Sequence, residues 1–498
     1  MNNKKEYVST RFIGNTCTAA EAIRDGLAKD GGLFVPLEIP RLTKDDFDKL
    51  IEMSYEERVA YVLSKFLDDY TYEELLDFAK KAYSRFYGDD PCPLVNIDEN
   101  LYVLELWHGP TCAFKDMALT MLPHLLVAAR KKTGEKSKTL ILVATSGDTG
   151  KAALEGFRDV EGVDIIVFYP SEGVSDMQKL QMKTQLGNNV YVCGIKGNFD
   201  DAQSAVKQIF NDDAIKAKLL EKNYKLSSAN SINWGRLAPQ IAYYISAYCD
   251  LISSDAIKFG DKINFCVPSG NFGNILAGYY AYKMGLPVNK LICASNSNKV
   301  LTDFIKTGVY DKNREFYKTM SPSMDILISS NIERLIYHIS GGNDLLAKDC
   351  MDNLKKNGKY SICHCLDKIQ SIFDAYYTTE EETRGAINAE YDYDGYVMDP
   401  HTAVAMSAYD EYTANTDDEH PAVIVSTASP YKFPSDVYEA ITGERENDAF
   451  EATKKLNEET ALDIPEPLQG LKTKAVRFND VIPKEDVAKA VLEYIDKK

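Results

Sequence analysis

The chain has 498 residues, of which 57 are Lys or Arg and 75 are Asp or Glu, so its formal net charge is −18. A hydrophobic share of 45% and a charged share of 27% are ordinary for a globular protein. The length alone corresponds to about three domains. The acidity argues against a general nucleic-acid binder and against a polybasic membrane-surface protein. An anionic substrate would therefore need a local cluster of hydrogen-bond donors.

Targeting signals and metal motifs are not evident in the sequence. No run of about 18 apolar residues predicts a membrane-spanning helix, and the first residues lack the apolar core of a signal peptide. The ten cysteines form no CxxC pair, which favours reduced thiols in a cytoplasmic protein. The one cluster, Cys363–His364–Cys365, shows the alternation of a short strand, and we expect no metal there.

The first hundred residues have a helical pattern. Residues 18–28 place apolar side chains at helical spacing after Thr18, a candidate N-terminal cap. Residues 30–36 predict a glycine turn that leads into a short extended run. Two acidic, Tyr-rich stretches, 54–70 and 72–88, are amphipathic and predict helices with a solvated acidic face.

A buried strand, a loop of small residues and a helix follow one another three times beyond residue 100. Such units predict a parallel α/β sheet. The three units span 139–159, 263–285 and 422–441, and further strands are expected at 163–169 and 291–295. Residues 300–390 contain mixed-charge helical stretches without a clear pattern.

Lys115 stands in the apolar segment HGPTCAFKDMAL (108–119). Such a lysine can be a surface residue whose ammonium reaches solvent from a helix. It can also be a desolvated amine, whose lowered pKa suits a nucleophile that forms a Schiff base. The segment alone leaves both interpretations open.

Two glycine-rich loops are candidate anion sites. In SGNFG (269–273), Gly270 and Gly273 allow a tight turn that exposes backbone N–H groups at a helix start. The loop SGDTG (146–150) adds the hydroxyls of Ser146 and Thr149. Neither loop has the dinucleotide or the ATP P-loop pattern. Two such loops and one apolar-flanked lysine suggest two phosphates, one on a cofactor and one on a substrate.

The segment SSANSINWGRLAPQ (227–240) groups polar residues beside apolar ones. Asn230, Ser231 and Asn233 could simply cap an amphipathic helix. Alternatively, Arg236 could supply the fixed cation that a phosphate dianion requires, because guanidinium matches phosphate geometry.

Taken together, these segments resemble the threonine synthase family, pyridoxal-phosphate enzymes of the tryptophan synthase β-like (fold type II) class. The similar segments run from about residue 9 to residue 434 and include DGGLFVP, HGPTCAFKD, ATSGDTGKAAL, EGVSDMQKLQM, SSANSINWGR, PSGNFGN, DPHTAVA and STASPYKFP. The resemblance implies an α/β fold with two parallel-type sheet domains and an added N-terminal region. The expected division is 1–100 for the N-terminal domain, 101–430 for the catalytic fold with a smaller subdomain around 115–230, and 431–498 for a helical C-terminal segment that packs on it.

The resemblance also implies roles for individual residues. Lys115 resembles the lysine that holds pyridoxal phosphate, and Asp148 lies where the cofactor's ring hydroxyl is expected. Thr427 resembles the hydroxyl residue that faces the pyridine nitrogen, and this neutral partner would leave that nitrogen less firmly protonated than a charged one. The loop residues expected at the cofactor phosphate are Gly270, Asn271, Phe272, Gly273 and Asn274. The donors expected at the substrate phosphate are Ser146, Thr149, Asn230, Ser231 and Arg236.

The chain departs from the family pattern in three places. Asp148 replaces the Asn that is usual in the wider class. Ala428–Ser429–Pro430 stands where Ala-His-Pro is expected, which puts the contacts of Ser429 in doubt. The stretch 300–390 does not align, so its domain edges are not predicted.

The implied reaction converts O-phospho-L-homoserine and water to L-threonine and phosphate, the last step of threonine biosynthesis, by γ-elimination and β-addition of water. The protein is then expected to be a lyase, either monomeric or homodimeric. One alternative is a sister enzyme such as threonine dehydratase or a cysteine synthase, whose substrates carry no γ-phosphate. Another is an inactive homologue that binds a phosphorylated ligand, although such a homologue would be expected to lose Lys115.

Overall fold

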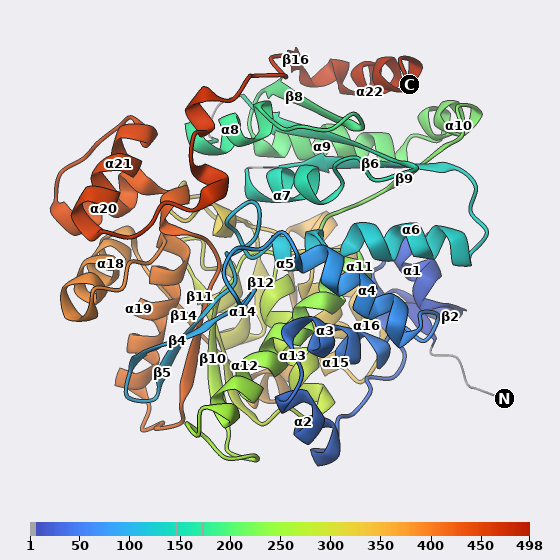
Figure 1. The fold of residues 1–498 in the computed structure, drawn as a ribbon. Helices are drawn as coiled ribbons and strands as arrows, with labels where there is room; N and C mark the ends of the chain where they lie inside the picture. The colour runs from blue at the N-terminus through green and yellow to red at the C-terminus, as the bar shows by residue number, and fades with distance from the viewer. Residues whose placement is uncertain (1–5, 146, 172–173) are drawn as a thin grey trace.

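Two open sheets, one above the other in Figure 1, form the framework of the molecule. The computed structural model describes residues 6–145, 147–171 and 174–498. The lower sheet has the strand order β14-β11-β10-β15-β5-β4, and the upper sheet has the order β16-β8-β7-β6-β9. All neighbours within these two sheets run parallel except β4 and β5. The predicted parallel α/β fold is therefore confirmed.

The lower sheet is covered on both faces. Its strands are β4 (Leu94–Asp98), β5 (Leu101–Glu105), β10 (Ile263–Pro268), β11 (Val288–Ser295), β14 (Phe373–Tyr377) and β15 (Ala422–Ser426). Phe265 and Val267 of β10 pack into the core that contains α12 (Ile241–Ser253) and α13 (Gly273–Met284). Cys266 points into a second core with α19 (Pro400–Asn415). Alternate side chains thus enter two apolar layers, which explains the unbroken apolar run in the sequence.

The upper sheet follows the same principle with shorter helices. Its strands are β6 (Lys138–Ala144), β7 (Val163–Pro170), β8 (Val190–Lys196), β9 (Tyr224–Ser227) and β16 (Val481–Pro483). Leu140 and Leu142 of β6 share a core with α9 (Phe199–Asn211) and α22 (Val487–Asp496). The opposite face packs in the main core, near α6 (Leu122–Lys132) and α7 (Asp148–Gly156). The remaining helices are α8 (Asp176–Lys183) and α10 (Asp213–Glu221).

The N-terminal region packs beside the lower sheet. Its antiparallel strands are β1 (Tyr7–Ser9), β2 (Phe12–Cys17) and β3 (Phe34–Pro36), and its helices are α1 (Ala19–Asp25), α2 (Lys44–Ile51), α3 (Tyr55–Ser64) and α4 (Tyr72–Tyr83). Thr18 and Glu21 form a capping box at the start of α1, as the sequence predicted for Thr18. The helices expected within 54–70 and 72–88 are present as α3 and α4.

The stretch 300–390 supplies part of the lower layer and one correction. It contains α14 (Val300–Thr307), β12 (Val309–Asp311), α15 (Ile332–Ile339), α16 (Asp344–Asn357), β13 (Lys359–Ser361), α17 (Leu366–Gln370), β14 and the start of α18 (Glu380–Asp394). The strand expected at Cys363–Cys365 was wrong, because these residues form a 3-10 helix. The Cys365 N–H donates to Ile362 O at 2.8 Å, which is the i to i+3 bond of such a turn, and the Cys363 N–H donates to Ser361 Oγ at 3.4 Å.

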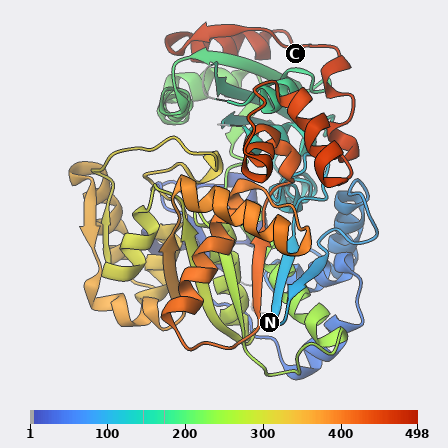
Figure 2. The ribbon, with the colours of Figure 1, turned by 90° about the vertical axis from the view of Figure 1, so that its left-hand side faces the viewer.

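The C-terminal segment connects both layers. Beyond β15 it forms α20 (Pro434–Thr442) and α21 (Ala449–Thr460), of which α20 contacts α18 of the lower layer and α21 contacts α8 of the upper layer (Figure 1). It then reaches the top of the molecule, where β16 pairs with β8 and α22 packs against α9 (Figure 2). Within the described part of the chain, no helix has the length and apolarity needed to cross a membrane. The same residues contain no group of three His, Cys, Asp or Glu side chains suited to a metal ion.

Candidate active site

A cavity of about 1240 Å³ has walls from both sheets. Residues at the carboxyl ends of β6, β7, β10 and β15 line it, which is the usual ligand position in open parallel sheets. Every predicted site residue that the structure describes lies on this wall: Lys115, Asp148, Thr149, Asn230, Ser231, Arg236, Gly270, Asn271, Phe272, Gly273, Asn274 and Thr427. Ser146 lies outside the described residues.

Lys115 immediately precedes the short helix α5 (Asp116–Leu119) and is only 8% exposed. Its Nζ donates to Ser323 Oγ at 3.1 Å and lies 3.5 Å from Asp148 Oδ2. Burial lowers the pKa of Lys115, and the positive charges of Arg236 and Lys432 lower it further against the opposing effect of Asp148. The surface interpretation of this lysine was therefore wrong, and the desolvated amine remains.

Asp148, the first residue of α7, is a buried carboxylate held by two cations. Its Oδ1 accepts from Gln178 Nε2 at 2.9 Å and lies 3.0 Å from Lys432 Nζ. Burial acts to raise the pKa of Asp148, but Lys432 and Lys115 outweigh it and hold the pKa well below its usual range. Asp148 is therefore ionised at neutral pH.

The loop between β10 and α13 forms a backbone cradle. Phe272 adopts a left-handed conformation with φ of 58°, and the helix starts at Gly273. A Cβ on Gly270 would lie 2.7 Å from Ser323 O, so no larger residue fits without moving the neighbouring loop. The resulting run of N–H groups at a helix start suits a phosphate.

Asn274 carries an unused donor at the same loop. Its Oδ1 accepts hydrogen bonds from the hydroxyls of Tyr243 and Tyr244, both at 2.7 Å. Its Nδ2 is buried, and no described residue offers it a partner. A buried amide donor on the wall of a cavity costs free energy unless a ligand satisfies it. These groups therefore fit a bound phosphate-bearing cofactor.

Arg236 is the buried cation of the site. It lies in α11 (Trp234–Leu237), which Asn233 caps, and its Nη1 donates to Ala229 O at 2.9 Å. Burial lowers the pKa of Arg236 to about 10, which leaves it charged at neutral pH. No carboxylate among the described residues forms an ion pair with it within 4.0 Å. The charge is therefore available to an anionic ligand.

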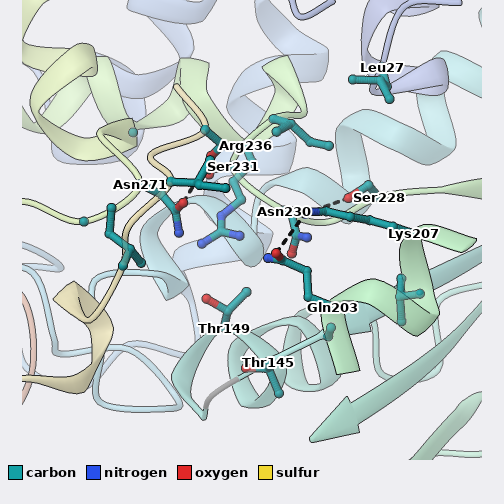
Figure 3. Close-up of a pocket in the computed structure, with 18 of the residues that line it drawn as sticks. Leu27, Thr145, Thr149, Gln203, Lys207, Ser228, Asn230, Ser231, Arg236 and Asn271 are labelled. Carbon is teal, nitrogen blue, oxygen red and sulfur yellow. Dashed lines mark hydrogen bonds between the residues drawn. The ribbon is translucent and has the colours of Figure 1, made fainter. Parts of the chain in front are cut away.

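The two predicted phosphate regions meet on one wall. Figure 3 shows Arg236, Ser231 and Asn271 gathered together, with Thr149 facing them from the first turn of α7. Ser330 joins the two segments, because its Oγ lies 3.4 Å from Ser231 Oγ and donates to Asn271 Oδ1 at 3.3 Å. Asn230 lies next to this group, and its N–H donates to Ser228 Oγ at 3.1 Å.

Thr427 and Ser429 follow β15 at the edge of the cavity. Thr427 lines the cavity and its carbonyl accepts the N–H of Phe114 at 2.8 Å, which ties it to the Lys115 segment. Ser429 Oγ accepts from the N–H of Tyr431 at 3.3 Å and caps the 3-10 helix Pro430–Lys432. The serine at this departure from the family pattern thus starts the turn that carries Lys432.

The sequence reasoning missed several groups that adjoin the site. Ser323, in the stretch without a motif, contacts Lys115, and its N–H donates to His401 Nε2 at 3.1 Å. Lys432 and Gln178 hold Asp148. His401, Gln178 and Lys432 lie in the segments DPHTAVA, EGVSDMQKLQM and STASPYKFP, which resemble the family. Their positions in these segments could have identified them as site residues. Ser323 had no such signal.

Arg334 was also missed, and it connects three parts of the chain. It is 0% exposed and donates to Phe34 O at 3.0 Å, to Ser231 O at 3.2 Å and to Ile232 O at 2.6 Å. Its neighbour Asn331 donates through Nδ2 to Asn271 O at 3.0 Å. The N-terminal region is thereby tied to both phosphate regions.

Comparison with known families covers nearly the whole chain. The family model described as "Threonine synthase N terminus" matches residues 6–83, "Pyridoxal-phosphate dependent enzyme" matches 86–428, and "Threonine synthase, C-terminal" matches 402–495. The threonine synthase of Saccharomyces cerevisiae is 36% identical, over 100% of this chain and 99% of its own length. The chain belongs to the threonine synthase family of pyridoxal-phosphate-dependent enzymes.

Two other relatives of this chain differ from each other in length. The threonine synthase of Pseudomonas aeruginosa is 38% identical over 88% of this chain and 91% of its own. The human protein "Threonine synthase-like 1" is 42% identical over 80% of this chain. The aligned region covers only 54% of that human protein, so the chain spans about half the length of the relatives named Threonine synthase-like 1.

Solved threonine synthase structures share the fold. The structure from Brucella melitensis, described as bound to pyridoxal phosphate, has a TM-score of 0.87 at 37% identity and covers 99% of both chains. The yeast structure has a TM-score of 0.88 at 35% identity and covers 100% of both. The predicted family and the fold type II class are both confirmed.

Proposed function

We propose that the chain catalyses the conversion of O-phospho-L-homoserine and water to L-threonine and phosphate, with pyridoxal phosphate as cofactor. The observation that carries the proposal is one cavity in which a buried lysine lies beside two adjoining groups of anion-binding residues. One region is the cradle at Gly270–Asn274, and the other centres on Arg236. A phosphorylated cofactor and a phosphorylated substrate account for both.

The residues that would hold the cofactor come from four segments. Lys115 would carry it covalently, and the N–H groups after β10 with Asn274 Nδ2 would bind its phosphate. Asp148 would face its ring hydroxyl, and Thr427 would face its ring nitrogen. Bound pyridoxal phosphate supplies an electron sink for negative charge at a substrate carbon.

Lys115 is the group suited to move protons. Burial lowers the pKa of its amine, so the unprotonated form of Lys115 is more populated than in an exposed lysine at the same pH. With the cofactor in place, Lys115 Nζ would take the proton from the substrate Cα and return it. Ser323 Oγ, at 3.1 Å, orients Nζ for that transfer.

The second anion region would act on the substrate phosphate. Arg236, Asn230, Ser231 and Thr149 line the wall where a phosphate can accept hydrogen bonds. These donors would fix the substrate before reaction and stabilise the charge of the departing phosphate.

A sister enzyme such as threonine dehydratase is the competing assignment. Its substrate has no γ-phosphate, so the cation of Arg236 would face the cavity without a counter-ion. An unpaired buried charge is costly, and the dehydratase assignment gives it no purpose.

Two further proposals concern the whole protein. We propose the division 1–100, 101–430 and 431–498, supported by the separate N-terminal sheet and by the return of the last segment to β8. We also propose a cytoplasmic location, supported by the ten cysteines, all of which are among the described residues and are unpaired there.

The test is a product assay with the cofactor-loaded protein and O-phospho-L-homoserine. Threonine and phosphate should form in equal amounts. Threonine and serine, offered separately, should yield little 2-oxo acid. Rapid 2-oxo acid formation from threonine without threonine formation from the phosphorylated substrate would replace the proposal with the dehydratase assignment.

A further inference from the structure

Lys432 is a fully enclosed cation beside the site. It is 0% exposed, and its Nζ donates to Thr111 O at 3.1 Å and to Gln181 Oε1 at 2.7 Å. Asp148 Oδ1, at 3.0 Å, is the third acceptor. An ammonium has three donors, so all of them have partners and the group is held in one position.

Asp148 is shared unequally between two lysines. Its Oδ1 is bound by Lys432 at 3.0 Å and by Gln178 at 2.9 Å, whereas its Oδ2 lies 3.5 Å from Lys115 Nζ. A carboxylate anchored in this way cannot approach Lys115 without losing those two shorter bonds. The ion pair with Lys115 is therefore the weaker of the two.

We propose that Lys432 is a positioning residue that anchors and neutralises Asp148, so that this carboxylate does not hold Lys115 in its protonated form. The inference rests on the proposed function only in taking Lys115 as the lysine that carries the cofactor. Lys432 itself lines no part of the cavity wall, and it acts through Asp148.

Several other charges surround these groups. Lys115 faces Asp148 from α7, Arg236 from α11 and Lys432 from the turn after β15. Burial and the two cations lower the pKa of Lys115, whereas Asp148 raises it. The further titratable groups that feel Lys432 are Asp116, Cys112 and Lys151. None of these three contacts Lys115 through a hydrogen bond or ion pair that the described residues show.

The experiment measures the titration of Lys115 in the cofactor-free chain. Its readout is the rate of pyridoxal phosphate uptake, followed by the absorbance of the bound cofactor across a range of pH. Only an unprotonated amine attacks an aldehyde, so uptake rises with pH to a plateau. The midpoint of the rise reports the pKa of Lys115 without any turnover of substrate.

Four variants separate the electrostatic role from structural damage. Lys432→Met should move the midpoint up by about one pH unit, so that uptake below the midpoint slows about tenfold. Asp148→Asn should move the midpoint down, because it removes the carboxylate that favours the charged amine. Lys432→Arg keeps the charge, so its midpoint should lie near that of the parent. In the Asp148→Asn background, the further change Lys432→Met should shift the midpoint much less than Lys432→Met shifts it in the parent.

Opposite shifts in Lys432→Met and Asp148→Asn would support the proposal. Damage that opened the cavity would return Lys115 to ordinary lysine behaviour and raise the midpoint in both, which would overturn it. An unchanged midpoint in Lys432→Met would also overturn it. If Lys432→Met does not fold, the double variant, which removes both charges of the Lys432–Asp148 pair, is compared with Asp148→Asn, and a large difference between their midpoints counts against the proposal.

Failure of the proposed function would appear in the product assay, where O-phospho-L-homoserine would yield no threonine whatever the midpoints are. Failure of the assignment of Lys115 would appear in Lys115→Ala, which would then bind pyridoxal phosphate and retain it after borohydride reduction, as the parent does. The proposed role of Lys432 fails instead if Lys115 carries the cofactor but the midpoint is unchanged in Lys432→Met.

Discussion

The loop after β6 and the loop after β10 both lead from a buried parallel strand through glycine into a helix. The first helix begins with Asp148, a carboxylate that two lysines neutralise. The second begins with Gly273 and Asn274, whose amide oxygen is bound by two tyrosines and whose donor is left over. A helix N-terminus favours negative charge in both cases. The first loop supplies its own anion and is suited to an amine, whereas the second is suited to an anion from outside.

Lys115 lies beside Asp148 of the first loop and is proposed to carry the cofactor whose phosphate the second loop binds. Its loss should therefore have the largest effect on turnover. Lys115→Ala removes the covalent attachment and the proton carrier together, and turnover should fall by at least about a thousandfold. The cofactor's absorbance band should also be lost. The exposed Lys131→Ala serves as control and should behave as the parent. Retention of both activity and band in Lys115→Ala would remove this lysine from the account.

Substitution of Arg236 tests the region proposed to bind the substrate phosphate. Arg236→Met removes a buried cation of similar length, and kcat/KM for the phosphorylated substrate should fall by about a hundredfold or more, since hydrogen bonds to charged groups contribute about 2 kcal/mol each. Inhibition by inorganic phosphate should weaken in parallel, whereas the spectrum of the bound cofactor should not change. An unchanged KM and unchanged phosphate inhibition would show that the phosphate binds elsewhere.

Substitution of Asn274 tests the cradle at Gly270–Asn274, which is proposed to bind the cofactor phosphate. Asn274→Asp converts the unused donor into a carboxylate that faces the cofactor phosphate, and cofactor affinity should fall by roughly 10- to 100-fold. Asn274→Ala removes the donor without adding charge and should have a smaller effect. Affinity is measured by titration of the cofactor-free chain. Equal affinities for Asn274→Asp and the parent would mean that this loop does not bind the phosphate.

Ser429 should give the smallest effect. Ser429→Ala removes the cap of the turn that carries Lys432 and should lower the free energy of unfolding by about 1 kcal/mol. Ser84→Ala, on the surface of the N-terminal region, is the matched control, and both are compared in denaturant unfolding. A loss no larger than that of the control would show that the turn is fixed by its packing alone.

The local pattern was sufficient for much of the framework. Each of the three predicted strand–loop–helix units is present, because a run of apolar residues, a loop of small residues and a helix are determined by neighbours in the sequence. The capping box at Thr18 is equally local. Cys363–Cys365 was mispredicted because these residues form a tight turn, in which the Cys365 N–H donates to Ile362 O at 2.8 Å.

The partners of the site residues could not be predicted in this way. Lys432 meets Asp148, and Ser323 meets Lys115, only after the two layers have assembled. Arg334 is satisfied largely by backbone carbonyls, which carry no sequence signal. The sequence could therefore nominate the residues on the cavity wall, while the charges and bonds that tune them depend on the tertiary structure.

The most direct test of the proposed reaction follows the oxygen atoms. The cofactor-loaded protein is given O-phospho-L-homoserine in water enriched in heavy oxygen, and both products are analysed by mass spectrometry. The account predicts that the phosphate leaves with its bridging oxygen and carries no label, whereas the new hydroxyl of threonine is labelled. Label in the phosphate, accompanied by homoserine instead of threonine, would mean simple phosphate-ester hydrolysis and would contradict the account.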